Sequence, residues 1–262
     1  MDTDQQNKEE LQYHLQTKKG DVGRYAILCG DPGRVASIAK YFDDAKEVAY
    51  NREFKTMTGT LNGVKISAVS HGLGCPSTDV CLRELINCGA DTFIRCGTCG
   101  GIDLEVESGD IVVATGAIRF EHTSFEYAPE CYPAVPDLSV TNALREASLE
   151  LGLPTKCGIV QCKDSFYGQH KPETSAVHQE LLHYWEAWKL LGVKASEMES
   201  SAAFVICSLF RCRCGSCFHT IWNQEREKAG LDQKQNMNTE NAIKVAVRAM
   251  SKIIEDDKKQ SQ

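Results

Sequence analysis

A run of arginine, glycine and threonine residues in the middle of the chain has the composition of an oxyanion site. Arg95-Cys-Gly-Thr-Cys-Gly-Gly101 follows Thr92-Phe-Ile94, a short apolar run that is typical of a buried strand. The arginine offers a fork of donors that matches phosphate oxygens, while the Thr98 hydroxyl and nearby backbone N–H groups can bind an oxyanion or a sugar. The glycines let the backbone turn sharply and approach a ligand closely. We expect a strand-end turn that binds phosphate or sugar; the alternative is a plain turn with a solvated arginine.

A second basic, glycine-bearing turn favours the phosphate interpretation. Gly30-Asp-Pro-Gly-Arg34 follows the apolar run 25–29 and precedes segment 35–42, whose apolar residues recur at helical spacing. A strand, a glycine turn and a helix in this order direct helix N–H groups toward an anion. The spacing is neither that of the dinucleotide fingerprint nor that of a P-loop. Because ligands bind at the carboxyl ends of strands in open α/β sheets, both turns are candidates for one phosphate site.

The rest of the chain positions these turns within an alternation of strands and helices. The Asn62-Gly63 pair lies between two apolar runs and predicts a β-hairpin. No linker, repeat or low-complexity segment interrupts the alternation, so we predict a single α/β domain spanning 1–262, with a central mixed β-sheet flanked by helices. Residues 1–10 and 256–262 are expected to be frayed tails. The predicted strands are 25–29, 47–50, 56–61, 64–69, 92–94, 110–114, 157–163 and 217–222, and the predicted helices are 35–42, 78–88, 140–151, 180–191, 200–210 and 239–254.

Composition limits the partners and the location. The 262-residue chain has a net charge of -7 and 42% hydrophobic residues, values that suit a globular protein and argue against nucleic acid or an anionic membrane as a partner. Its first residues are polar and lack the apolar stretch of a secretory signal. The longest apolar segment, at 202–210, is too short to span a bilayer. We therefore expect a cytoplasmic protein.

The chain contains thirteen cysteines, a high number. Most lie inside apolar runs, where cysteine behaves as a small buried hydrophobe, and without a secretory signal they are expected to stay reduced. The tightest cluster, Cys212-Arg-Cys-Gly-Ser-Cys217, lacks a second pair of ligands at the spacing of a structural zinc site. We predict reduced structural thiols, with a redox or metal role as the alternative.

The motifs, taken in order, resemble those of the nucleoside phosphorylase superfamily and, within it, the uridine phosphorylases. The resemblance extends from Leu11 to about Ile254, and the order and spacing of the motifs together are specific although each motif alone is weak. It implies the superfamily's α/β fold and the reversible phosphorolysis of uridine to uracil and α-ribose 1-phosphate in pyrimidine nucleoside salvage. The motifs are Leu11-Gln-Tyr-His14, Gly30-Asp-Pro-Gly-Arg34, Arg52-Glu-Phe54, Arg95 to Gly101, Lys163-Asp-Ser-Phe-Tyr-Gly-Gln-His170, Glu197-Met-Glu199 and, similar to one bacterial branch of the uridine enzymes, Asn223-Gln-Glu-Arg226.

The resemblance assigns roles to residues around a bound nucleoside. A cationic cradle would hold phosphate against a sugar that reacts with oxocarbenium character, and no covalent nucleophile is implied. Glu199 would accept hydrogen bonds from the ribose hydroxyls, and Gln169, with a donor and an acceptor, would match the uracil edge. The implied phosphate-binding residues are Gly30, Arg34, Arg52, Arg95 and Thr98. The implied nucleoside-binding residues are His14, Thr98, Cys99, Gly100, Phe166, Gln169, His170, Glu197, Met198 and Glu199, and the implied catalytic residues are Arg34, Arg95, Thr98, Gln169 and Glu199.

Several of these residues also have ordinary structural explanations. Arg52 and His14 are implied to act across a subunit interface, but their local sequences alone favour a surface arginine on a hairpin and a plain surface or packed histidine. Phe166 alone would be a core aromatic, and Gln169 a loop residue. The resemblance is therefore what gives these four residues a role in binding.

The chain departs from the uridine phosphorylase pattern around the base. Many of those enzymes have arginines near the positions of Lys171 and Gln224. His170, Lys163 and Arg226 are alternative sources of the missing positive charge, and the sequence leaves open which of them supplies it. It also leaves open whether deoxyuridine or thymidine is cleaved as well.

The resemblance implies no cofactor and no required metal, with inorganic phosphate as co-substrate. Glu53 and Ser77 match residues that help to hold a monovalent cation between subunits in related enzymes, so K+ is a candidate ligand, with a salt bridge of Glu53 as the alternative. The implied partners are the nucleoside, phosphate and further copies of the chain. The implied homo-oligomer shares active sites between subunits and is a hexamer in preference to a dimer.

Three other functions are alternatives. A purine nucleoside phosphorylase of the same fold usually has an aspartate just after the last strand, where this chain has Asn223-Gln-Glu. A hydrolytic nucleosidase would not need Arg34, Arg52 and Arg95 together. A catalytically silent nucleoside-binding protein would fit the altered residues near the base.

Overall fold

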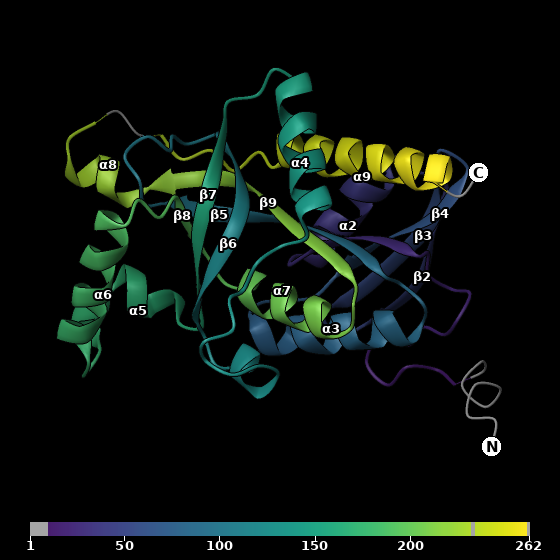
Figure 1. Ribbon diagram of the computed structural model, residues 1–262, viewed down its shortest axis with the longest axis horizontal. Helices are drawn as coiled ribbons and strands as arrows, with labels where there is room; N and C mark the ends of the chain where they lie inside the picture. Colours follow the sequence, from purple (N-terminus) through teal and green to yellow (C-terminus); the bar gives the residue numbers. More distant parts are fainter. Residues whose placement is uncertain (1–9, 232–233, 261–262) are drawn as a thin grey trace.

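The computed structural model of the protein describes residues 10–231 and 234–260, in which nine strands form one hydrogen-bonded sheet (Figure 1). The strands are β1 (Tyr25–Cys29), β2 (Asp43–Asn51), β3 (Phe54–Leu61), β4 (Val64–Ser70), β5 (Thr92–Gly101), β6 (Ile111–Phe120), β7 (Thr155–Lys163), β8 (Ala195–Glu197) and β9 (Arg213–Asn223). Their order is β2-β3-β4-β1-β5-β8-β7-β6-β9. Because β5 also pairs with β9, the strands from β5 to β9 close into a ring.

The sheet is mixed, as predicted. β1 pairs in parallel with β4 and β5, whereas β2, β3 and β4 form an antiparallel meander whose second turn is the predicted hairpin at Asn62-Gly63. The parallel register places Leu28 of β1 beside Arg95 of β5. The turn that follows β1 therefore lies next to the carboxyl half of β5, as the positions of the two glycine motifs had suggested.

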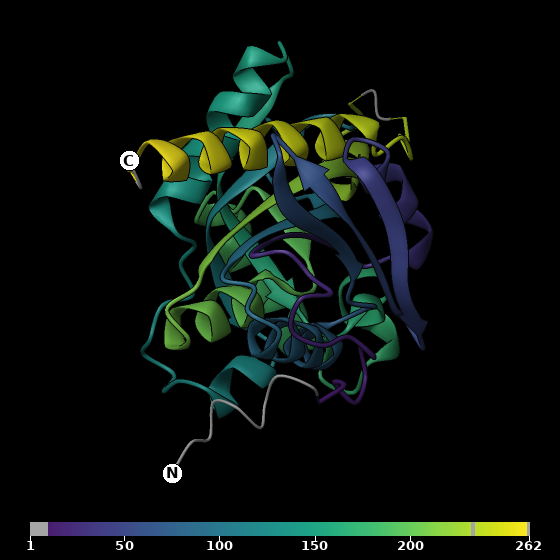
Figure 2. The same ribbon diagram turned by 90° about the vertical axis from the view of Figure 1, so that its right-hand side faces the viewer.

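Helices cover both faces of the sheet. The helices are α2 (Pro32–Ala39), α3 (Cys75–Asn87), α4 (Leu138–Glu150), α5 (Phe166–His170), α6 (His178–Leu190), α7 (Ser200–Leu209), α8 (Gln224–Lys228) and α9 (Glu240–Gln260). In both ribbon views α9 lies on one face and α3 on the other (Figures 1 and 2). α3 and α7 supply one buried apolar cluster, whereas α2, α4 and α9 supply the second. The predicted α/β domain with a helix-flanked mixed sheet is confirmed.

The structure corrects the expected end of β5. The strand does not stop at Ile94 but continues to Gly101, so the motif that begins at Arg95 is strand rather than turn. It pairs with β9 throughout, and at Gly101 an added Cβ would lie 2.6 Å from the Asn223 amide nitrogen. The glycines here serve the close approach of neighbouring groups instead of a reversal of the backbone.

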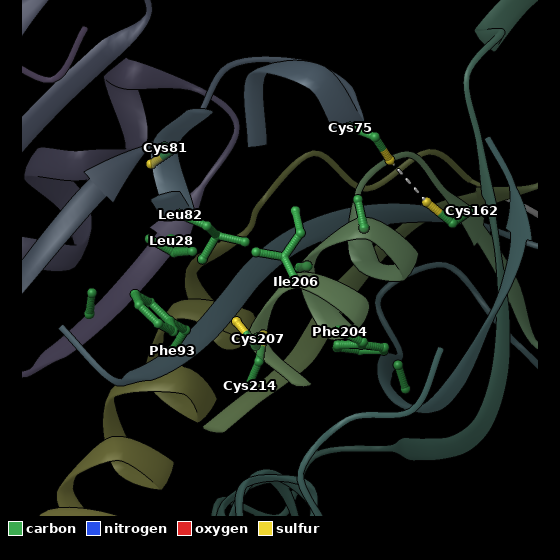
Figure 3. Packing of buried hydrophobic residues seen from close by; sticks show 14 of the residues in the cluster. Leu28, Cys75, Cys81, Leu82, Phe93, Cys162, Phe204, Ile206, Cys207 and Cys214 are labelled. Carbon is green, nitrogen blue, oxygen red and sulfur yellow. Dashed lines mark hydrogen bonds between the residues drawn. The ribbon is translucent and has the colours of Figure 1, made fainter. Parts of the chain in front are cut away.

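β9 accounts for the cysteine cluster. The strand begins at Arg213, earlier than predicted, and an added Cβ at Gly215 would lie 2.6 Å from Val140 of α4. All thirteen cysteines are free thiols. In the core, the sulfur atoms of Cys75 and Cys162 lie 3.6 Å apart (Figure 3).

The carboxyl end of the chain also differs from the expectation. α9 continues to Gln260, so residues 256–260, expected to belong to a frayed tail, are helical. Asp257 anchors this end, because it accepts a hydrogen bond from Nη1 of Arg213 at 2.9 Å and another from the Tyr25 hydroxyl at 2.7 Å. Residues 1–9, which include most of the expected N-terminal tail, lie outside the described residues. Within 10–231 and 234–260, no helix combines the length and the apolarity that crossing a membrane requires.

Candidate active site

A cavity of about 660 Å³ lies where the strands around β1 and β5 reach their carboxyl ends. Ligands bind at this edge of α/β sheets. The predicted phosphate and nucleoside residues that line it are Gly30, Arg34, Arg95, Thr98, Cys99, Gly100, Phe166, Gln169, His170, Glu197, Met198 and Glu199. His14 and Arg52 are not among its lining residues. The cavity thus brings together, within one chain, all but two of the residues expected to bind substrate.

One end of the cavity is formed by the turn after β1. Asp31 caps α2 by accepting a hydrogen bond from the Gly33 backbone N–H at 2.8 Å, which fixes the start of the helix. Arg34, in the first turn of α2, donates from Nη1 to the Cys96 carbonyl of β5 at 3.4 Å. Gly30 and Arg34 are therefore held next to β5, where they can face an anion.

A buried arginine and two buried glutamates meet in the middle of the cavity wall. Arg95 is 4% exposed, and its Nη1 lies 3.1 Å from Oε2 of Glu197. Its Nη2 forms a second ion pair with Glu199. Glu199 also accepts a hydrogen bond from the Gly74 backbone N–H at 2.8 Å. The loop after β4 thus positions the carboxylate that the sequence motif assigns to ribose.

The charges of this cluster stabilise one another. Burial alone would lower the pKa of Arg95, but Glu199 and Glu197 outweigh it and raise that pKa. Burial alone would raise the pKa of Glu199, but Arg95 and then His71 lower it. For Glu197, burial prevails and its pKa is raised. Arg95 and Glu199 are therefore held as a charged pair, with Glu197 the more readily protonated acid.

His71 is a buried residue near this cluster that was not predicted as a site residue. It is fully buried, and burial lowers its pKa to about 4, so the imidazole is neutral near pH 7. Its Nδ1 lies 3.1 Å from the Thr78 hydroxyl, and its Nε2 has no hydrogen-bond partner among the described residues. The signal that could have found it is its place at the end of a strand, directly before Gly72.

The opposite end of the cavity contains a polar network around Ser196. The ammonium group of Lys163 donates to the Ser196 hydroxyl at 2.5 Å. That hydroxyl lies 2.6 Å from Oε1 of Gln169 and is also hydrogen-bonded to Gln161. The network fixes the amide of Gln169 at the cavity wall. Ser196 and Gln161 were not predicted as site residues, although Ser196 directly precedes the Glu197-Met-Glu199 motif.

Aromatic rings lie beside this network. The ring centroids of Phe166 and His170 are 4.3 Å apart, and those of His170 and Trp222 are 6.3 Å apart. Phe166 is 48% exposed, so one part of its ring is available to a ligand. Burial and the nearby Lys163 lower the pKa of His170, which favours its neutral form. A second cavity of about 310 Å³ adjoins this region and shares Lys163, Gln169, His170 and Trp222 with the first.

The two residues outside the cavity lie beside each other. His14 pairs with Glu84 through Nδ1 at 2.7 Å, and its carbonyl accepts a hydrogen bond from Asn51 at 2.8 Å. Arg52 follows Asn51 in the turn between β2 and β3, where its φ is 54°. The ring of Phe54, also next to this turn, lies 6.2 Å from that of His14. Within one chain, these residues form a small surface apart from the cavity lining.

The two residues proposed for a cation are in contact. The Ser77 hydroxyl donates to Oε1 of Glu53 at 2.8 Å. A hydrogen bond with its own backbone, then the one from Ser77, lowers the pKa of Glu53. The pair lies close to Gly72, where an added Cβ would be 2.6 Å from Cγ of Glu53.

Comparison with known proteins gives consistent results. The family described as the phosphorylase superfamily matches residues 24–256. The chain is 49% identical over 248 residues to a uridine phosphorylase of Treponema pallidum, covering 95% of this chain and 96% of that protein. It is 40% identical to a uridine phosphorylase of Thermococcus kodakarensis, with 86% and 82% covered, and 34% identical to a guanosine phosphorylase of Halorubrum lacusprofundi, with 92% and 98% covered. With its strand-end cavity and a match over most of its length, the chain belongs to the phosphorylase superfamily.

Proposed function

We propose that this chain catalyses the reversible phosphorolysis of uridine to uracil and α-ribose 1-phosphate. The observation that carries the proposal is a single cavity that holds two arginines, a buried charged carboxylate and a fixed amide side chain. Phosphorolysis needs a group of each kind, for phosphate, ribose and base. The two uridine phosphorylases at 49% and 40% identity support uridine as the nucleoside.

Phosphate is proposed to bind among Gly30, Arg34, Arg95 and Thr98. Two guanidinium groups and a hydroxyl offer charged and neutral donors for its oxygens. In the structure, Arg95 faces Glu199 and Glu197, so it is already fixed in place by ion pairs before a ligand binds. Such preorganised donors stabilise charge without the cost of rearrangement during the reaction.

The sugar is proposed to lie against Glu199, Met198 and Glu197. Glu199 is a charged acceptor, which suits the two hydroxyls of a ribose diol. In the reaction, the bond between C1′ and the base nitrogen breaks, and its electron pair leaves with the base. A phosphate oxygen forms the new bond to C1′, and the proton of hydrogen phosphate passes through solvent to the uracil anion. The cationic end of the cavity holds the attacking phosphate while the sugar carries positive charge.

The base is proposed to stack on Phe166 and to pair with Gln169. The half-exposed Phe166 ring offers a face, and the Gln169 amide is held by Ser196. Cys99, Gly100 and His170 would complete the walls of this end.

The purine alternative is not favoured. Asn223, where purine enzymes usually have an aspartate, does not line the cavity, because its Oδ1 accepts from the Glu225 N–H at 2.9 Å and its amide donates to the Val106 carbonyl at 2.9 Å. Glu225 is engaged as well, by Trp185 at 2.9 Å. The described acids that line the cavity are Asp31, Glu197 and Glu199. Neither Asn223 nor Glu225 is therefore available to protonate a purine ring.

Incubation of the purified chain with uridine or inosine, each with and without phosphate, tests the proposal. Uracil release from uridine that requires phosphate is the expected result. Release without phosphate would indicate a nucleosidase, and phosphorolysis of inosine but not uridine would indicate a purine enzyme. Binding of uridine without turnover in phosphate would favour the silent nucleoside-binding protein.

We also propose that the chain forms a homo-oligomer, a hexamer in preference to a dimer, with shared active sites. His14 and Arg52 lie together but outside their own cavity, an arrangement that suits donation to a neighbouring copy. K+ is proposed to bind at Glu53 and Ser77, near this surface. The thirteen free thiols support a reducing compartment, and we propose the cytoplasm.

Subunit mixing tests the shared site. Arg52→Met and Glu199→Gln variants are each expected to lose most activity, since one would lack the donated arginine and the other the ribose acceptor. Refolding the two together should restore part of it, because some sites then combine an intact Glu199 with an intact Arg52. Each variant refolded alone is the control. No recovery from the mixture, with oligomers shown to have exchanged subunits, would contradict the shared site.

A further inference from the structure

The departing uracil carries negative charge on its carbonyl oxygens and ring nitrogens. A positive group beside it would stabilise that charge as it develops. The positions where many uridine phosphorylases have arginines hold Lys171 and Gln224 in this chain. The structure shows which cationic side chain takes their place.

Three residues near the base site cannot supply this charge. Arg226 donates from Nη1 to the Leu104 carbonyl at 2.6 Å, pairs with Glu107 at 3.1 Å and does not line the cavity. Lys171 is exposed and is likewise absent from the lining. Gln224 carries no charge and lines only the smaller cavity. None of the three can place a positive charge on the base.

His170 lines the cavity but does not supply the charge. Burial is the largest influence on its imidazole and lowers its pKa, and Lys163 lowers it further. Near pH 7 the ring is therefore neutral. It can pack against the base or donate one hydrogen bond, but a cation must come from another residue.

Lys163 has the required position. It is the last residue of β7, is 5% exposed and lines both cavities at the end that holds Gln169. Its Nζ donates to the Ser196 hydroxyl at 2.5 Å, and that hydroxyl lies 2.6 Å from Oε1 of Gln169. Ser196 is the one hydrogen-bond partner of this ammonium among the described residues, so two of its three donors stay available.

The surroundings of Lys163 leave its ammonium group mostly charged near pH 7. Burial lowers its pKa to about 8, while the nearby carboxylates of Glu197 and Glu199 oppose this change. Burial raises the pKa of Cys99 to about 12, so that thiol adds no charge near pH 7. An unpaired buried ammonium is costly, which gives Lys163 a gain from meeting an anionic base.

We propose that Lys163 is a catalytic residue that contacts the carbonyl edge of the pyrimidine and stabilises the uracil anion as the glycosidic bond breaks. Ser196 is a positioning residue that ties this ammonium to the Gln169 amide. The inference rests on the proposed function and names its base-site cation. It also predicts that the enzyme discriminates among bases by how much charge they carry as they leave.

The test compares Lys163→Met with Lys171→Met, which removes a lysine eight residues away in sequence that lies outside the cavity lining. The substrates are uridine and 5-fluorouridine, whose fluorine makes the departing base more acidic and less dependent on a cation. Lys163→Met should lower kcat/KM for uridine by about 100-fold, the usual effect of losing one such donor. The loss with 5-fluorouridine should be several-fold smaller. Lys171→Met should change neither substrate by more than about twofold, as for an exposed site.

Comparing the loss of kcat/KM for the two substrates distinguishes a catalytic role of Lys163 from an effect of the substitution on folding. A variant that is merely misfolded loses activity equally with both, so equal losses would overturn the role of Lys163. Wild-type activity in Lys163→Met would overturn it too, while phosphate-dependent turnover by the wild type would leave the proposed function standing. If the wild type does not cleave uridine with phosphate, the proposed function fails and this inference fails with it.

Discussion

Replacing Arg95 by methionine would remove the only cation that forms an ion pair with the two central glutamates among the described residues. The side chains of Glu197 and Glu199 are 0% and 3% exposed, so both carboxylates would be left buried without an ion-pair partner. Breaking a buried pair in this way costs about 3–5 kcal/mol. A domain is typically stable by about 5–15 kcal/mol. Arg95→Met is therefore expected to fold but to lose a large part of its free energy of unfolding.

The loss of stability caused by Arg95→Met should depend on pH in a defined direction. Burial already raises the pKa of Glu197, and without Arg95 the pKa values of both glutamates in the folded variant should lie above their unfolded values. Groups with a raised folded pKa stabilise the fold below the unfolded pKa and lose that contribution as the pH rises through the folded pKa. The difference in free energy of unfolding between wild type and Arg95→Met should thus be larger at about pH 7.5 than at about pH 5.

Urea denaturation followed by tryptophan fluorescence measures the difference. The double variant Arg95→Met/Glu199→Gln, which removes one of the stranded charges, is the matched control. Its loss of free energy of unfolding should be smaller than the sum of the losses in the two single variants. The difference, which is the coupling energy between the two residues, should be about 0.5–3 kcal/mol. An Arg95→Met protein as stable as wild type at the higher pH, or a cycle without coupling, would refute the account of the cluster.

Two further predictions concern neighbours of this cluster. Gly97→Ala would place a Cβ 2.5 Å from Nη1 of Arg95, so the guanidinium must move. The rate of phosphorolysis should fall by about 100-fold. The loss of stability in a denaturation experiment should be smaller for Gly97→Ala than for Arg95→Met. A Gly97→Ala enzyme of normal activity would contradict that contact. The pKa of His71 is about 4 when folded and near 6.5 when unfolded, so wild type should lose about 3 kcal/mol relative to His71→Asn as the pH falls from 6.5 to 4. Parallel pH profiles of the two proteins would contradict a buried neutral imidazole.

The order of the elements could be predicted because each strand begins as an apolar run and is followed by a turn signal or a helical pattern. The hairpin at Asn62-Gly63 and the helix after Gly30 follow from local rules of this kind. The extension of β5 to Gly101 could not, because it depends on pairing with β9, more than a hundred residues later in the chain, and on the Asn223 side chain that packs against Gly101. Glycine indicates a turn in the local sequence, but here it permits close packing.

The candidate site also has a part that could be predicted from the sequence and a part that depends on contacts between distant segments. Twelve of the predicted site residues line one cavity, whereas His14 and Arg52 lie outside it. Ser196 and Gln161, which belong to the network around Gln169, were not predicted, because they meet only when β7 and β8 pair. The choice of Lys163 over Arg226 likewise depended on where β7 ends and where Glu107 lies.

The central claim is that phosphate, rather than water, attacks the sugar in this cavity. Phosphorus NMR of a single sample containing the protein, uridine and phosphate tests it most directly, because α-ribose 1-phosphate has a signal distinct from inorganic phosphate. The account predicts that this signal grows in proportion to the uracil released and that the reaction reverses when uracil and ribose 1-phosphate are supplied. Uracil release with no new phosphorus signal would mean hydrolysis and would contradict the account.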